Sequence, residues 1–173
     1  MTFVQENKEK NIRIEKMGIT DISAVVRMCD QCVGEKLYSE SEIRDAAVNP
    51  DSFIFLLKNQ ENMLCGYVYF QKTSQNEMAD FLKIDQAVLK NLMGSEKNTL
   101  VNFRSIGIEP KMRNKGLSEI LFSFAIEYSQ KILKADYMLG AFWKKYDEIS
   151  MESNLRKFKF EHLLTVKNMW YEN

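Results

Sequence analysis

Residues 106–118 read IGIEPKMRNKGLS, and the rest of the chain can be arranged around this stretch. Ile106 and Ile108 are β-branched, which is typical of a strand, and Pro110 has no N–H group to give to a sheet. A helix is predicted to begin near Asn114. Apolar residues at helical spacing then continue it, at Leu117, Ile120, Leu121, Phe124, Ala125 and Tyr128. The stretch therefore predicts a strand that breaks into a turn and opens an amphipathic helix.

The start of that helix suits a phosphate group. Its first N–H groups have no carbonyl partner and lie at the positive end of the helix dipole. Gly116 lacks a Cβ, so the backbone can approach an anion closely there. Lys111, Arg113 and Lys115 flank the turn, and they either pair with the phosphate or remain solvated. We therefore interpret the turn as a phosphate-binding loop.

Residues 110–118 also resemble the acetyl-CoA signature of the GNAT N-acetyltransferase superfamily, which runs Arg or Gln, two residues, Gly, one residue, then Gly or Ala. Arg113 and Gly116 match its first two fixed positions, and Ser118 takes the third as a different small residue. The preceding Ile-x-Pro also fits the family's strand ending. The resemblance implies that the backbone of Ile106 and Ile108 pairs with pantetheine. It also implies that the CoA pyrophosphate is held at Arg113, Asn114, Lys115, Gly116, Leu117 and Ser118.

The composition is that of an ordinary globular protein. The 173 residues are enough for one domain, 1–173, with a sizeable core. Lys plus Arg and Asp plus Glu number 24 each, so no net charge attracts nucleic acid or an anionic membrane. The apolar runs are too short to span a bilayer, and the polar start lacks the apolar core of a signal peptide. We therefore expect a cytoplasmic protein with neither nucleic acid nor membrane as a partner.

Three cysteines, an odd number without a disulfide framework, fit a reducing compartment. Cys29 and Cys32 form a C-x-x-C, but they lie in a helical pattern with no second Cys or His pair nearby. We interpret them as packed thiols rather than as a metal or redox site, and we expect no metal.

Ahead of the phosphate-binding loop, the pattern predicts a strand, two helices, a hairpin and a further strand. Residues 1–11 are charged and are expected to be frayed. The elements are expected at residues 12–17, 20–33, 39–48, 52–58, 63–71 and 99–108, with the second helix starting at either Ser39 or Ser41. Strand, two helices and hairpin is the order in which GNAT domains begin.

Residues 72–98 are more than a hairpin connection needs. Apolar residues at helical spacing predict one inserted helix from Asp80 to Met93, ended by Gly94. This insertion either packs on the sheet edge as a lid, or shapes the acceptor pocket, or makes a dimer contact, so a homodimer stays open.

After the long helix, which should fade near Lys131 to Lys134, residues 136–143 predict a fifth strand parallel to the fourth. A short helix over 147–158 and terminal strands over 160–166 and 169–171 follow. Residues 155–160, LRKFKF, resemble the family's closing Tyr-Glu-Lys-x-Gly-Phe segment. The chain is thus expected to have an α/β (α+β) fold of GNAT type, a mixed central sheet of six to seven strands flanked by helices.

Acetyl transfer to an amine requires a neutral amine, a site that stabilises the oxyanion, and a proton for the departing thiolate. Backbone amides of the fourth strand can supply the second. For the proton, the family often uses a Tyr at the position that Leu155 takes here. Tyr146 and Asn154, with Ser153 beside it, are the replacement candidates, and each could equally be an exposed residue of loop or helix.

For the base, Glu109 ends the fourth strand and could act through water, although a solvated Glu at a turn is the simpler interpretation. His162, the only histidine, lies on a terminal strand beyond the usual reaction centre. We therefore prefer Glu109.

The leading hypothesis is an N-acetyltransferase that moves an acetyl group from acetyl-CoA to a primary amine of a small molecule or peptide, by direct attack in a ternary complex. The alternative is a CoA-binding module with weak or lost catalysis, suggested by Leu155. A mononucleotide binder would need a Gly-rich loop ending in Lys-Ser or Lys-Thr, and the sequence has none.

Overall fold

The computed structural model describes residues 4–7, 11–34, 36–94, 98–141 and 155–163. The described part contains one six-stranded sheet in the order β1-β2-β3-β4-β5-β6. Neighbouring strands are antiparallel except β5 and β6, which are parallel. This mixed sheet confirms the expected fold class. The strands are β1 (Val4–Asn7), β2 (Ile12–Lys16), β3 (Ser52–Asn59), β4 (Leu64–Thr73), β5 (Leu100–Ile108) and β6 (Tyr137–Gly140).

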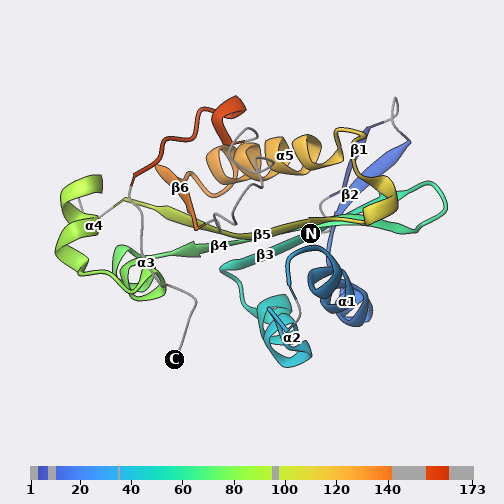
Figure 1. Cartoon of the computed structure of the whole chain (residues 1–173), viewed down its shortest axis with the longest axis horizontal. Coiled ribbons are helices and arrows are strands. Elements are labelled where there is room, and N and C mark those ends of the chain that lie inside the picture. The colour runs from blue at the N-terminus through green and yellow to red at the C-terminus, as the bar shows by residue number, and fades with distance from the viewer. Residues whose placement is uncertain (1–3, 8–10, 35, 95–97, 142–154, 164–173) are drawn as a thin grey trace.

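The helices cover both faces and one end of the sheet (Figure 1). α5 (Leu117–Lys131) runs along one face, and α1 (Ile22–Cys32) and α2 (Glu40–Val48) cover the other. α3 (Gln75–Leu82) and α4 (Gln86–Met93) lie at the end where β4 leaves the sheet. Short 3-10 turns, η1 (Ile19–Asp21) and η2 (Pro110–Met112), precede α1 and the loop into α5. No helix of these described residues is long and apolar enough to cross a membrane.

Aromatic packing holds α5 on its face. Phe55 is fully buried between strands and helix, with its ring centroid 4.7 Å from that of Phe124 and 5.9 Å from that of Phe70. Tyr128 closes the same cluster, 5.0 Å from Phe55. Each buried ring removes a large apolar area from water, so this face supplies much of the stability.

The start of α2 is fixed by a capping box. Ser39 accepts a hydrogen bond from the Glu42 N–H at 3.2 Å, and the Glu42 carboxylate accepts one from the Ser39 N–H at 2.7 Å. Two helix-start donors are thereby satisfied. The predicted start at Ser39 is confirmed.

The inserted segment differs from the prediction of one helix over Asp80 to Met93. Lys83 adopts a left-handed conformation with φ of 53° and ends α3, and Asp85 then caps α4 through the Ala87 N–H at 2.7 Å. A left-handed residue cannot continue a right-handed helix, so the apolar stripe is divided between two helices. Both pack with Leu100 of β5 in a separate apolar cluster.

Three further expectations are wrong. Residues 4–7 are not frayed, because they pair with β2 as β1. The long helix begins at Leu117 rather than near Asn114, because Asn114 and Gly116 are left-handed, with φ of 62° and 72°. Residues 160–163 are not part of a strand. The remainder of the predicted terminal elements lies outside the described residues, as does most of the predicted helix over 147–158.

Candidate functional site

The turn that the sequence predicts as a phosphate-binding loop follows the end of β5. After Ile108 the chain makes the turn η2, passes through left-handed Asn114 and Gly116, and enters α5 at Leu117. Gly116 is the N-cap residue, and no side chain caps this end of the helix among the described residues. The first-turn amides are therefore available to an anion, which the helix dipole also favours.

Two side chains brace the loop against the strand end. Arg113 Nε donates to the Ile108 carbonyl oxygen at 3.3 Å, and Cys32 Sγ donates to the same oxygen at 3.2 Å. The guanidinium of Arg113 thus lies at the mouth of the loop, where it also acts on the Cys32 thiol. Lys111 is exposed on η2, and Lys115 Nζ lies 3.7 Å from Met112 Sδ. The loop carries three cations around the helix start.

The edge of β5 beside β6 is only partly paired. Residues Leu100–Phe103 pair with Tyr137–Gly140, and from Arg104 to Ile108 no described strand pairs with β5 on that side. The Glu109 N–H donates a hydrogen bond to the backbone carbonyl oxygen of Cys65 in β4 at 3.0 Å. Because peptide groups of successive strand residues point to opposite sides, those of Ile106 and Ile108 point away from β4. This edge, open among the described residues, is where the resemblance places pantetheine.

A β-bulge lies at the point where the pairing with β6 ends. Tyr69 of β4 is opposite Ser105, but the next residue, Phe70, is opposite Phe103, so Arg104 is an extra residue. The bulge interrupts the usual alternation, since Phe103 packs on the α5 face while Arg104 and Ser105 both lie towards α2. It therefore directs two consecutive polar side chains to one face.

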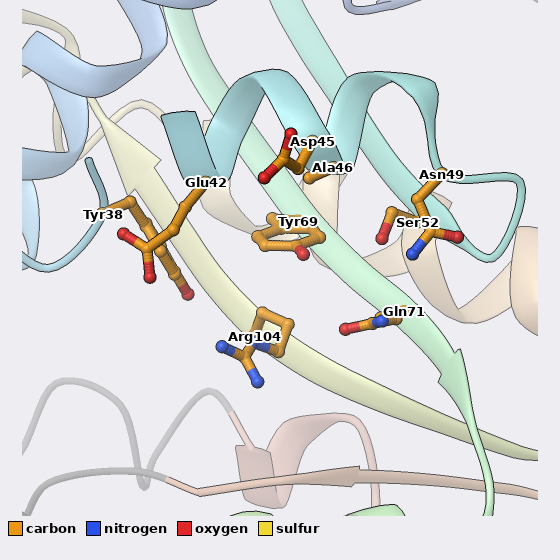
Figure 2. Close-up of a pocket in the computed structure, with 9 residues that line it drawn as sticks. All are labelled: Tyr38, Glu42, Asp45, Ala46, Asn49, Ser52, Tyr69, Gln71 and Arg104. Atoms are coloured by element: carbon orange, nitrogen blue, oxygen red, sulfur yellow. The ribbon is translucent and has the colours of Figure 1, made fainter. Parts of the chain in front are cut away.

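A pocket of about 240 Å³ lies on that face, between α2 and strands β4 and β5 (Figure 2). Figure 2 shows the ring of Tyr69 between the carboxylates of Glu42 and Asp45, which come from α2, and the guanidinium of Arg104. The residues that line the pocket are Tyr38, Glu42, Asp45, Ala46, Asn49, Ser52, Tyr69, Gln71 and Arg104.

The ionisation of the pocket residues follows from their contacts. The backbone N–H of Ser39, then its hydroxyl, lowers the pKa of Glu42 below its ordinary value, so this carboxylate stays charged at neutral pH. Burial raises the pKa of the Tyr38 phenol, which therefore stays protonated. The pocket combines permanent charges of both signs with a neutral phenol.

Several buried polar atoms beside the pocket have no hydrogen-bond partner in the part of the chain that the structure describes. They include Tyr67 Oη, Ser105 Oγ and Arg104 Nε. The Ser105 hydroxyl lies near those of Tyr38 and Tyr67, but the geometry is not that of a hydrogen bond. Buried polar groups without a partner reduce stability, so this face of the sheet contributes less to stability than the aromatic face under α5.

The structure separates the predicted base, Glu109, from this pocket. Glu109 is half-buried at the end of β5 and does not line the pocket. Tyr146, Ser153 and Asn154 lie outside the described residues. Leu155 is partly buried against the aromatic cluster under α5, and His162 is exposed.

Cys29 and Cys32 are free thiols, as interpreted from the sequence. Burial raises the pKa of Cys29 to about 11 and also raises that of Cys32. Raised pKa values make both thiols poor nucleophiles and poor metal ligands. The described residues contain no group of three or more His, Cys, Asp or Glu that could hold a metal ion.

Sequence reasoning did not assign roles to the pocket residues Tyr38, Glu42, Asp45 and Arg104. A signal was present on β5, where Asn102, Arg104 and Ser105 interrupt an otherwise apolar strand. The residues of α2 carried no such signal in the sequence, because the exposed face of a helix is usually charged.

Comparison of the sequence finds no matching family model and no matching curated protein. Solved structures do match. A tetramutant of BH1408 protein from Bacillus halodurans has a TM-score of 0.68 at 11% identity, over 88% of this chain and 96% of that one. The aminoglycoside 6'-N-acetyltransferase AAC(6')-Ih from Acinetobacter baumannii has 0.66 at 9%, over 94% and 98%.

AAC(6')-Iy, an aminoglycoside N-acetyltransferase solved in complex with CoA, has a TM-score of 0.65 at 10% identity, over 100% of this chain and 96% of that one. Sequence identities this low support a shared fold and nothing beyond it. The element order, the partly paired β5 edge and these likenesses agree, and the chain has the fold of the GNAT N-acetyltransferases.

Proposed function

We propose that this protein is an acetyl-CoA-dependent N-acetyltransferase that acetylates a primary amine of a small molecule or peptide. The observation that carries the proposal is the arrangement along β5. One end of the strand meets an uncapped helix start, its middle has an open edge, and the bulge beside that edge opens onto a charged pocket. A donor and an acceptor can therefore reach the same strand from opposite sides.

The donor side is built from the residues that the signature singled out. The amides around Asn114, Gly116 and Leu117 would hold the CoA pyrophosphate, with Lys115, Ser118 and the guanidinium of Arg113 beside it. The peptide groups of Ile106 and Ile108 would pair with pantetheine along the open edge. Complexes of AAC(6')-Iy with CoA and with a bisubstrate analogue, CoA-S-monomethyl-acetylneamine, support this use of the fold.

The acceptor side is the pocket over Tyr69. Glu42 and Asp45 would attract an ammonium group, and loss of its proton gives the amine that attacks the thioester. Backbone N–H groups at the bulge, freed from regular pairing, would stabilise the oxyanion. Glu109 acting through water is the proposed base, and Tyr146 or Asn154 the proposed acid. Direct attack within one ternary complex needs no covalent enzyme intermediate.

A second candidate function is a CoA-binding module with weak or lost catalysis. Leu155 favours it, because it takes the position of the family's frequent Tyr acid and packs, partly buried, against the core under α5. Transfer that relies on positioning alone would be slow. The two candidates are distinguished by testing acetyl transfer to a panel of amines, with the released CoA as the measured product. Binding of CoA without transfer to any amine supports the module.

The CoA site is tested by a matched pair of substitutions at Gly116. Asp and Asn have nearly equal size and both tolerate left-handed geometry, so Gly116→Asp and Gly116→Asn differ chiefly in charge. We expect Gly116→Asp to weaken CoA binding at least tenfold more than Gly116→Asn, measured by titration calorimetry with circular dichroism as a check of folding. Equal affinities in the two folded variants would place the pyrophosphate elsewhere.

We further propose a cytoplasmic location, supported by the three free cysteines and the balanced charge. Self-association through the α3 and α4 segment remains a proposal, and measurement of the mass in solution tests it.

A further inference from the structure

Arg104 adds a positive charge to the proposed acceptor pocket, which the carboxylates of Glu42 and Asp45 alone would make a site for cations. Its guanidinium carbon lies 4.5 Å from the ring centroid of Phe81 and 5.9 Å from that of Tyr69. Stacking on aromatic faces fixes the plane of a guanidinium while leaving its N–H groups in that plane free to bind. The side chain is thus held in place without a charged partner.

No described carboxylate forms a direct ion pair with Arg104, and its Nε is buried without a hydrogen-bond partner among the described residues. Glu42 and Asp45 line the same pocket, and the charge of Arg104 helps to lower the pKa of Glu42, but neither carboxylate lies within ion-pair distance of the guanidinium. A partly buried guanidinium without an anion is costly, and a planar carboxylate is the ligand that its fork geometry fits.

The CoA phosphates are not that anion. Arg104 precedes Ile108 by four residues, which is roughly 13 Å along a strand, and its side chain lies on the α2 face. The loop that would hold the pyrophosphate begins only after Ile108. The anion that Arg104 awaits must therefore enter the pocket with the acceptor.

The charge and the volume of the pocket further restrict the chemical class of the acceptor. Two carboxylates and one guanidinium give the pocket a net charge of about −1, so a ligand with two ammonium groups and one carboxylate complements it. A volume of about 240 Å³ is below the range of roughly 300–1,000 Å³ for sites of drug-sized ligands. A single diamino carboxylic acid fits both limits better than a large polycation.

We propose that the pocket recognises an amine acceptor by its carboxylate, which binds Arg104, while Glu42 and Asp45 bind the amino groups; diamino carboxylic acids are the best match. This inference rests on the proposed acetyltransferase function, since it names the class of acceptor. Arg104 is a specificity-determining residue in this scheme.

The test compares L-lysine with cadaverine, which is lysine without its carboxylate. Binding of each to the CoA-loaded protein is measured by calorimetry, and transfer from acetyl-CoA is measured by chromatography of released CoA. The variants are Arg104→Gln and, as a matched control, Arg44→Gln. Arg44 lies on α2, pairs with Glu40 at 2.9 Å, and does not line the pocket.

We expect the wild type to prefer lysine at least tenfold, in Kd and in kcat/KM. Arg104→Gln should abolish the preference by raising Kd and KM for lysine, with cadaverine changed less than threefold, and Arg44→Gln should keep it. Equal binding of the two amines by the wild type, binding of neither, or an equal loss for both in a folded Arg104→Gln variant would overturn the proposal.

The outcomes also separate this inference from the function on which it rests. Lysine binding that depends on Arg104, without transfer to any amine, refutes the acetyltransferase and leaves the carboxylate site standing. Transfer to cadaverine but not to lysine supports the acetyltransferase and refutes the carboxylate site.

Discussion

The face of the sheet under α5 and the face under α1 and α2 are made from the same strands but bury different chemistry. Under α5, Phe55, Phe70 and Phe124 pack ring against ring. On the other face, Tyr67 and Ser105 bury hydroxyl groups that have no partner among the described residues. The α5 face gains stability from every contact, whereas the α2 face keeps polar groups that a ligand can use.

The largest expected effect tests this difference through stability. Phe55→Ala removes a fully buried ring from the aromatic cluster and should lower the free energy of unfolding by about 3–5 kcal/mol. Tyr67→Phe removes only an unpaired hydroxyl and should change it by less than about 1 kcal/mol, with a small gain as the expected sign. Urea unfolding measures both. Similar losses in the two variants would show that the faces are equivalent.

An intermediate effect concerns alkaline pH. Burial raises the pKa of Cys29 from 9.0 to about 11, so the folded state keeps its proton where the unfolded state has lost it. This stability is fully present below pH 9 and is lost as pH rises through 11. Between pH 8 and 10.5, we expect the wild type to lose about 1–2 kcal/mol more than Cys29→Ala. The comparison uses the slope of stability with pH, because the cavity in Cys29→Ala lowers stability at every pH. Parallel pH profiles would contradict the assignment.

The smallest effect uses two similar capping boxes. Ser39 caps α2 through Glu42, and Ser74 caps α3 through Glu77, with N–H to carboxylate distances of 2.7 Å and 2.8 Å. Ser39→Ala and Ser74→Ala should each cost about 1 kcal/mol. Only Ser39→Ala should also raise the KM for the acceptor severalfold, because Glu42 lines the pocket and Glu77 does not. Steady-state kinetics beside thermal unfolding checks this, and equal kinetic effects would separate Glu42 from the acceptor.

The same capping boxes stabilise their helices less at acid pH. Their N–H groups lower the pKa of Glu42 and Glu77, so this stabilisation is present above the ordinary value of 4.5 and is lost as pH falls through the lower folded values.

Much of the fold could be predicted because local rules agree with it. Ser39 marks a helix start, and the apolar runs of β3 and β4 mark two strands, all of which the structure contains. The division of the inserted helix could not be predicted, because Lys83 adopts a left-handed conformation that its type seldom takes. The start of α5 was misplaced for a similar reason at Asn114.

Only the proposed donor side of the candidate site could be predicted. The proposed phosphate-binding loop is one contiguous stretch, so Arg113 and Gly116 can be recognised from their spacing in the sequence. The pocket combines Tyr38, Glu42 and Arg104 from three separate segments, and only folding brings them together. A single sequence carries no record of such long-range proximity.

The extra residue at position 104 has a consequence for comparing this strand with others of its fold. Phe103 and Ile106 both face α5 although they are three positions apart, an odd number, so the two halves of β5 follow alternation patterns that are out of step. An ungapped alignment of β5 with a strand that lacks the bulge would match residues of one face with those of the other. Deleting Arg104 would restore regular alternation, so the α2 face would lose one polar side chain while Ser105 to Ile108 would keep their present faces.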